Sequence, residues 1–108
     1  MKPNPKNKPY RINRKTSAGK KEYRVLLDAI WGRDKGICQL CYRQCIAPEY
    51  HHVIFRSQGG SDVLENMLTL CFDCHHIIHH GNHGSAEYRQ KAVDRLEEIN
   101  GSRNNILK

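Results

Sequence analysis

The chain has 108 residues, of which 38% are hydrophobic and 7% aromatic, and Lys and Arg outnumber Asp and Glu by 18 to 11. A chain of this length is expected to form one domain with a small core, a class that often relies on metal ions or disulfides. It contains no apolar run long enough for a membrane-spanning helix. The N-terminal residues also lack the apolar segment of a secretory signal, so we expect a cytoplasmic protein, in which disulfides are rare.

The positive charge is concentrated in the first 24 residues, which hold nine Lys or Arg and a single acid, Glu22. Three of the four prolines also lie there, and we expect residues 1–21 to form a flexible basic arm. Such an arm suits phosphate contacts on a nucleic acid, with Lys20, Lys21 and Arg24 as candidate contacts. A solubilising tail is the alternative interpretation of the same charges.

The first element predicted after the arm is a short helix from Glu22 to about Asp34, because its apolar residues form a broad stripe. Tyr23 and Trp31 belong to this stripe, and we interpret them as core residues rather than as platforms for stacked bases. A strand is predicted over residues 49–55, where β-branched and aromatic residues surround two histidines.

The region after this strand is predicted to be a loop over residues 56–62, from its glycine and polar content. Residues 63–70 are expected to form a tight turn with a short strand or helical piece. Residues 75–80 are predicted to be helical. A last helix is predicted from about residue 85 to 100, with Ser85 as candidate N-cap and Gly101 as the expected stop.

Two Cys-x-x-Cys units, at Cys38 and Cys41 and at Cys71 and Cys74, are separated by 29 residues. Two residues between thiolates let a tight turn present both sulfurs to one tetrahedral ion, so the two units predict a closed, structural zinc site. Reduced buried thiols or a redox pair are the alternative. Cys45 is left over and is expected to be a small buried side chain, although it could compete as a ligand.

A second group of metal-binding side chains consists of histidines. On a strand, His51 and His52 point to opposite faces, so one can bind a metal while the other acts as a base. In a helix, His75 and His79 share one face at the i, i+4 spacing that chelates metal ions. His76 and His80 form a parallel pair on a neighbouring face, and spacing alone does not choose between the two pairs.

Together these residues resemble the zinc-bearing HNH endonucleases over residues 32–80. The resemblance implies a small α+β fold, a ββα-metal finger in which a hairpin with the paired histidines on its first strand precedes a helix. The four-cysteine zinc site would stabilise this finger, flanking helices would surround it, and the nuclease domain would span residues 22–108. The resemblance rests on both Cys-x-x-Cys units, the His51-His52 pair, the loop Gly59-Gly60-Ser61-Asp62, Asn66, His75 and His79.

The resemblance also implies the roles of the site residues. His51 takes the position of a metal ligand and His52 that of the general base, while Asn66 takes the middle position and orients the base through the loop. His75 is a further metal ligand, and His79 matches a ligand found in some members. Neutral imidazole, with an unperturbed pKa near 6.5, can accept a proton from water at physiological pH.

The implied activity is hydrolysis of DNA, most simply of double-stranded DNA, with 5′-phosphate and 3′-hydroxyl products. One ion and one base would cut one strand at a time, so nicking is expected. The catalytic ion is left open among Mg²⁺, Mn²⁺, Ni²⁺ and Zn²⁺. Arg56 is a candidate phosphate contact, a protein partner could supply sequence specificity, and no membrane partner is expected. The expected setting is a bacterial or phage-infected cell.

Two other protein classes compete with the nuclease. A zinc-stabilised DNA-binding module without catalysis explains the cysteines and the basic arm, but not the four histidines together with Asn66. A RING-type or knuckle-type interaction domain leaves the basic arm without a role.

Overall fold

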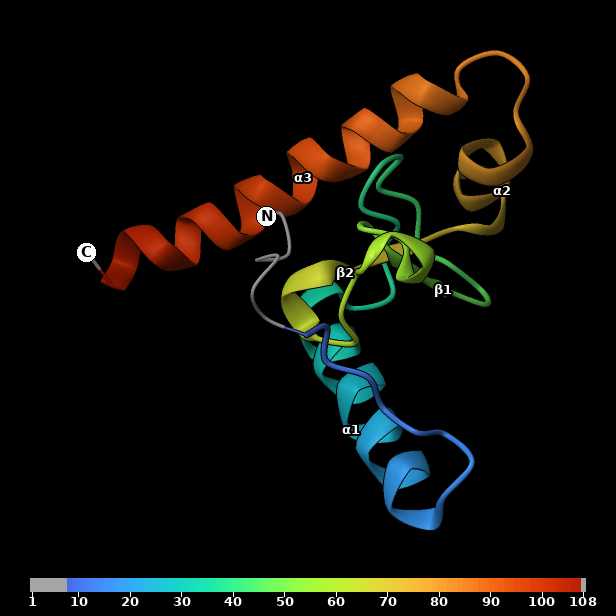
Figure 1. Ribbon diagram of the computed structural model, residues 1–108. Coiled ribbons are helices and arrows are strands. Elements are labelled where there is room, and N and C mark those ends of the chain that lie inside the picture. Colours follow the sequence, from blue (N-terminus) through green and yellow to red (C-terminus); the bar gives the residue numbers. More distant parts are fainter. Residues whose placement is uncertain (1–7, 108) are drawn as a thin grey trace.

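The structure is a computed structural model that describes residues 8–107, with side chains up to Gly101. Three helices surround a two-stranded sheet, which confirms the expected small α+β fold (Figure 1). None of the helices in this described part is long and apolar enough to cross a membrane. In chain order the elements are α1 (Ser17–Asp34), β1 (Glu49–His52), the 3₁₀ helices η1 (Arg56–Gln58) and η2 (Leu64–Asn66), β2 (Met67–Leu70), α2 (Phe72–His80) and α3 (Ser85–Leu107).

The two strands form an antiparallel hairpin that leads directly into α2. Glu49 lies opposite Leu70, and His52 lies opposite Met67 at the other end of the ladder. Cys71 separates β2 from α2 and caps the helix, because its Sγ accepts the backbone N–H of Cys74 at 3.4 Å. The hairpin followed by this helix is the ββα arrangement that the sequence predicted.

The hairpin lies between two clusters of buried side chains, one on each face. Because side chains alternate along a strand, Leu68 and Leu70 face α2 and α3, whereas Met67 faces α1. Figure 1 shows α1 on one side of the hairpin and α2 with α3 on the other. On β1, His51 pairs with Leu68 and therefore shares the α2 face, and His52 pairs with Met67 and shares the α1 face.

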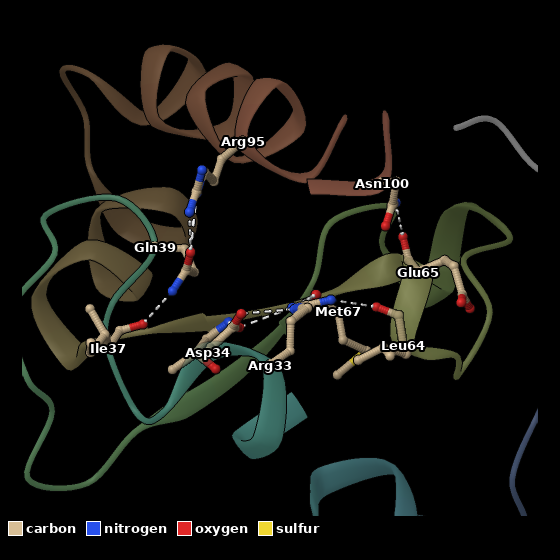
Figure 2. Close-up of polar contacts among 10 residues, drawn as sticks. Arg33, Asp34, Ile37, Gln39, Leu64, Glu65, Met67, Arg95 and Asn100 are labelled. Atoms are coloured by element: carbon tan, nitrogen blue, oxygen red, sulfur yellow. Dashed lines mark hydrogen bonds and ion pairs between the residues drawn. The ribbon is translucent and has the colours of Figure 1, made fainter. Parts of the chain in front are cut away.

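Polar contacts fix the end of α1 to the hairpin (Figure 2). The Arg33 guanidinium donates to the carbonyl oxygens of Leu64 at 3.0 Å and Met67 at 2.6 Å. The carboxylate of Asp34 pairs with Arg33 at 2.8 Å and accepts the backbone N–H of Thr69 at 3.1 Å. Because both side chains are largely buried, these contacts hold α1 in one position against β2.

The long helix α3 is attached to the cysteine-bearing loop and to η2. The Arg95 guanidinium donates to the side-chain oxygen of Gln39 at 2.9 and 3.1 Å, and the amide of Gln39 donates to the carbonyl of Ile37 (Figure 2). Further along α3, the Asn100 amide donates to the Glu65 carbonyl at 2.9 Å. This helix therefore spans one side of the finger.

Four boundaries differ from the predicted ones, and one of them is the start of α2 at Phe72 rather than at residue 75. The first helix begins at Ser17 rather than Glu22, because the Thr16 hydroxyl caps it by accepting the N–H of Gly19 at 2.9 Å. The strand β1 ends at His52, three residues early. Gly101 as a helix stop was wrong, since α3 continues to Leu107. Glycine lowers helix stability by only about 1 kcal/mol and does not by itself end a helix.

The expected basic arm divides into parts with different structures. Its first seven residues lie outside the described residues. Residues 17–21 belong to α1, so Lys20 and Lys21 lie on a helix rather than on an irregular segment. Between these parts, Ile12 is buried in the cluster under α1.

Candidate active site

The four predicted zinc cysteines come together in the structure. The sulfur atoms of Cys38, Cys41, Cys71 and Cys74 all lie within 4.8 Å of one another. The Sγ atoms of Cys41 and Cys71 are 3.8 Å apart. In a tetrahedral site with zinc–sulfur bonds of about 2.3 Å, neighbouring sulfurs are separated by about 3.8 Å. The donor set therefore fits a structural zinc ion.

The thiols of this cluster do not titrate alike. Burial raises the pKa of Cys38, but the backbone N–H groups of Cys41 and Cys71 outweigh it and bring the pKa down to about 7. Burial raises the pKa of Cys74, and the neighbouring Cys71 and Cys38 raise it further. A bound divalent ion would displace the remaining protons, so zinc binding at this cluster should release protons.

Cys45 lies beside the cluster rather than within it. It is half-buried, packs against the core around Cys38, and its sulfur contacts the carbonyl of Arg43 at 3.8 Å. Burial raises the pKa of its thiol. These contacts fit the small packed side chain that we expected.

Three of the histidines form a second group with ligand geometry. Ring nitrogens of His51, His75 and His79 lie within 4.8 Å of one another, and the Nε2 atoms of His75 and His79 are 3.1 Å apart. This spacing suits tetrahedral imidazole ligands with metal–nitrogen bonds of about 2.0 Å. The rings of the other helical pair, His76 and His80, lie 4.8 Å apart and are tilted by 40°, and neither belongs to this group of described ligands.

Glu49 supports this group and was missed by the sequence analysis. Its Oε1 lies 2.6 Å from Nδ1 of His75, which leaves Nε2 of that ring for a metal ion. A carboxylate on the far nitrogen fixes the tautomer and orientation of a ligand histidine. The strand period of two is the signal that could have found it, because it places Glu49 on the same face as His51.

Burial sets the protonation of His51. Together with the positive charges that His75 and His79 can carry, it lowers the pKa of this ring to about 3. Burial also lowers the pKa of His79, and the neighbouring His75 adds to that effect. Both rings are therefore neutral at physiological pH, which is the form that binds metal ions.

His52 lies on the other face of β1 and has a different partner. Its Nε2 lies 2.8 Å from Oδ1 of Asp62, and its side chain is 18% exposed, against 3% for Asp62. With a carboxylate at Nε2, the favoured tautomer carries its proton there, so Nδ1 is free to accept one. Asp62 therefore orients the ring of the expected base, His52. In the sequence, only the place of Asp62 in the predicted loop pointed to this contact.

The surroundings of Asp62 favour its ionised form. Burial raises its pKa, but the backbone N–H of Ile12, 2.9 Å from Oδ2, and the His52 ring outweigh that effect and lower it. The Arg56 guanidinium lies 3.3 Å from Oδ1 and acts in the same direction. The predicted phosphate contact Arg56 is thus next to His52, with its side chain 39% exposed.

Asn66 contacts the loop rather than the His52 ring. Its Oδ1 accepts the N–H of Ile54 at 2.8 Å, and its Nδ2 donates to the carbonyls of Ile54 at 3.0 Å and Ser61 at 3.1 Å. A Cβ at Gly60 would lie 1.7 Å from the Ile54 oxygen and 2.9 Å from Nδ2 of Asn66, so only glycine fits there. These contacts fix the loop that carries Asp62.

The segment before α1 braces the same loop from outside. The N–H of Tyr10 donates to the Ser61 hydroxyl at 2.9 Å, and the N–H of Asp62 donates to the Tyr10 carbonyl at 2.8 Å. The Arg11 guanidinium donates to the carbonyls of Arg56 and Gly60. Residues that the sequence analysis assigned to the basic arm therefore help to position Asp62.

The three remaining basic candidates lie apart from the histidines. Lys20, Lys21 and Arg24 are exposed on α1. Lys20 and Arg24 line a cavity beside that helix, together with Trp31. The structure thus brings Arg56 to the candidate base and places the other three on a separate surface.

Comparison with known proteins gives one family and several partial relatives. Residues 38–81 match the family model of HNH endonuclease. The type IV methyl-directed restriction enzyme EcoKMcrA of Escherichia coli K12 is 38% identical over 44% of this chain and 20% of its own length. Anaredoxin of Nostoc is 41% identical over 41% of this chain and 58% of its own length. The probable mobile endonuclease C of phage T4 is 50% identical over 30% of this chain and 15% of its own length.

The matched region contains both candidate metal sites and the loop between the strands. The chain spans between 15% and 58% of the length of these three relatives. The similarity therefore covers the ββα finger with its two candidate metal sites.

Proposed function

We propose that the chain, which carries an HNH endonuclease domain at residues 38–81, is a metal-dependent endonuclease that hydrolyses DNA. The observation that carries the proposal is the division of two adjacent histidines between the faces of β1. His51 joins the group of three imidazoles, and His52 lies against the Asp62 carboxylate. Binding a metal and moving a proton are thus assigned to separate side chains.

The three imidazoles of His51, His75 and His79 would hold one divalent cation. When bound, this ion supplies charge neutralisation at the phosphate and stabilises the leaving oxygen. Glu49 keeps the His75 ring in the orientation that ligation requires. The ion is Mg²⁺, Mn²⁺, Ni²⁺ or Zn²⁺, and a plasmid assay with each added ion distinguishes them.

His52 would act as the general base. Its Nδ1 accepts a proton from the attacking water, and the ionised Asp62 stabilises the imidazolium that forms. As the water oxygen bonds to phosphorus, the bond between phosphorus and the 3′ oxygen breaks, and that oxygen takes up a proton from solvent water to become a hydroxyl. Arg56 would contact the phosphate beside the base, since its guanidinium is already held at Asp62.

The four-cysteine group would hold a structural zinc ion. Its closed geometry leaves no position for a substrate, so the group stabilises the fold and contributes nothing to the chemistry. It joins the loop at Cys38 to the start of α2, the helix that carries His75 and His79. Loss of zinc would therefore displace the catalytic ligands as well.

Double-stranded DNA is the proposed substrate, and nicking of one strand is the proposed outcome, because one ion and one base serve one phosphodiester at a time. Two of the relatives, a restriction enzyme and a probable mobile endonuclease, agree with this activity by name. A partner protein would supply any sequence specificity. The proposed setting is the cytoplasm of a bacterial or phage-infected cell.

A supercoiled-plasmid assay tests the proposal. The zinc-loaded protein is incubated with plasmid while Mg²⁺, Mn²⁺ and Ni²⁺ are titrated separately, beside His52→Ala and the matched control His76→Ala. His76 is an exposed histidine of α2 outside the group of three imidazoles. We expect metal-dependent nicking by the wild type and by His76→Ala, and none by His52→Ala with zinc content and fold intact.

Two results would contradict the proposed nuclease activity or the role of His52. A wild type that shifts plasmid mobility without cutting it under any ion would identify a zinc-stabilised DNA-binding module instead. Cutting that survives in purified His52→Ala would remove His52 from the role of base.

A further inference from the structure

A cavity of about 610 Å³ lies on the α1 side of the molecule, apart from the group of three imidazoles. Three aromatic side chains line it: Tyr23 and Trp31 from α1, and Tyr50 from β1. Trp31 is 46% exposed, so its interpretation as a core residue was wrong. Of the apolar stripe on α1, Leu26 and Ile30 reach the core, while Trp31 lies at the edge of the stripe.

The Trp31 ring is held in place by a glycine. Gly36 has a φ of +71°, and a Cβ built there would lie 2.4 Å from Cζ3 of the indole. The side chain of any larger residue would displace the ring, so the indole packs directly on the backbone of Gly36. An indole that packs on the backbone and is still half-exposed offers a surface on which another ring can stack.

Basic side chains surround these rings. Arg14, Lys20 and Arg24 line the cavity against a single acid, Asp28. The Arg14 guanidinium lies 4.5 Å from the centroid of the Tyr23 ring. Aromatic rings beside lysine and arginine form the combination that binds unpaired nucleotides, because the rings stack on bases while the cations contact phosphates.

The cavity lies on the same face of the hairpin as the candidate base, His52. Tyr50 alternates along β1 with Glu49 and His51, so it shares the α1 face of the hairpin with His52. Residues two apart on a strand are separated by about 7 Å, a distance that a nucleic-acid strand spans in about two nucleotides. A strand with its scissile phosphate at His52 can therefore reach the cavity within a few nucleotides.

We propose that this cavity binds an unpaired nucleotide of the DNA strand next to the cleavage site, with its base on Trp31 and its phosphate on Lys20 and Arg24. The proposal rests on the nuclease function for the identity of the strand, and it deepens that function by naming the feature of the DNA that is preferred, an unpaired nucleotide beside the cleaved bond. A base that is stacked and paired within a duplex cannot enter the cavity, whereas a bulge, a flap or a single strand offers one freely.

The chain contains one tryptophan, so its fluorescence reports on the cavity directly. The zinc-loaded protein, without added divalent ions, is titrated with oligothymidine, with a blunt duplex, and with the same duplex carrying one extrahelical thymidine. We expect the first and third ligands to quench Trp31 and to bind roughly tenfold more tightly than the blunt duplex, since one base stacked on an aromatic ring contributes on this scale.

Variants separate stacking from packing. Because the variants of Trp31 lack the fluorophore, their binding is followed by the fluorescence anisotropy of labelled DNA. Trp31→Leu should lose roughly tenfold in affinity for the bulged duplex and little for the blunt one, while Trp31→Phe keeps most of the discrimination. Val25→Ala, at a 67% exposed position of the same helix, is the matched control and should bind as the wild type does. Zinc content and circular dichroism establish that each variant is folded. If Trp31→Leu does not fold, the double variant Lys20→Ala and Arg24→Ala replaces it and should weaken binding of the bulged duplex.

Three results would overturn the inference: equal affinity for bulged and blunt duplexes, unquenched Trp31, or equal losses in Trp31→Leu and Trp31→Phe. Because binding is measured without cleavage, the two proposals fail separately. A protein that nicks plasmid but does not discriminate refutes the cavity alone. A protein that prefers the bulge but never cuts supports the cavity and refutes the nuclease.

Discussion

Replacing Asn66 with alanine should reduce cleavage by more than the loss of stability explains. The Asn66 side chain is 3% exposed and makes three hydrogen bonds to the backbone of Ile54 and Ser61, at 2.8, 3.0 and 3.1 Å. Alanine would leave one N–H and two carbonyl oxygens without these partners. Because the same loop carries Asp62, its relaxation should also move the carboxylate away from His52.

The expected magnitude follows from these three contacts. Each hydrogen bond contributes about 1 kcal/mol net, and unsatisfied groups raise that figure, so the free energy of unfolding should fall by about 3 kcal/mol. In a domain of this size such a loss lowers Tm by about 10 to 20 °C. A displacement of a catalytic group by about 1 Å can reduce the rate about a hundredfold, and this is the additional effect expected on nicking.

The assay compares nicking rates well below the melting temperature of every protein used. Leu96→Ala is the matched control, because it truncates a buried side chain of α3 that packs in the cluster under α2. Its expected cost of about 3 kcal/mol equals that of Asn66→Ala, but it leaves the loop alone. Leu96→Ala should keep near wild-type activity. If Asn66→Ala does so too, Asn66 stabilises the fold without positioning the base.

Three further predictions concern the metal sites and pH. Glu49→Gln should weaken Mn²⁺ or Ni²⁺ binding by about 10- to 100-fold in titration calorimetry, and an unchanged affinity would show that this carboxylate does not orient His75. Cys41→Ser should lose zinc in native mass spectrometry and melt at a lower temperature, whereas full zinc occupancy at an unchanged Tm would exclude Cys41 as a ligand. The pKa of His51 is lowered to about 3 in the folded state, so between pH 3 and about pH 6.5 only the unfolded chain binds a proton at this residue. The free energy of unfolding should therefore fall as the pH is lowered through that window, by on the order of 1 kcal/mol per pH unit. Urea unfolding near neutral pH and near pH 5 should therefore show a steeper loss for the zinc-loaded wild type than for His51→Asn, and parallel losses would contradict the assignment.

Local spacing made the metal groups predictable. A Cys-x-x-Cys turn and an i, i+4 histidine pair depend on residues within one turn of chain, and the alternation along a strand separates His51 from His52 without further information. The sequence alone left open whether His75 and His79 or their neighbours would join His51. That choice depends on how α2 packs against the hairpin.

The partners of the base were not predictable for a related reason. Asp62 reaches His52 only because the loop closes tightly at Gly60 and because the backbone groups of Tyr10 and Ile12, some fifty residues away in the chain, form hydrogen bonds with Ser61 and Asp62. Trp31 shows the limit of periodicity, since a broad apolar stripe indicates the buried face of a helix but not where its edge meets solvent.

The most direct test of the account measures Mn²⁺ binding and plasmid nicking side by side in zinc-loaded wild type, His51→Ala and His52→Ala. In the proposed mechanism, metal binding belongs to one face of β1 and proton transfer to the other. His52→Ala should therefore bind Mn²⁺ as the wild type does and fail to nick, while His51→Ala should lose both. Loss of Mn²⁺ binding in His52→Ala, or wild-type Mn²⁺ affinity in His51→Ala, would contradict this division between the two histidines.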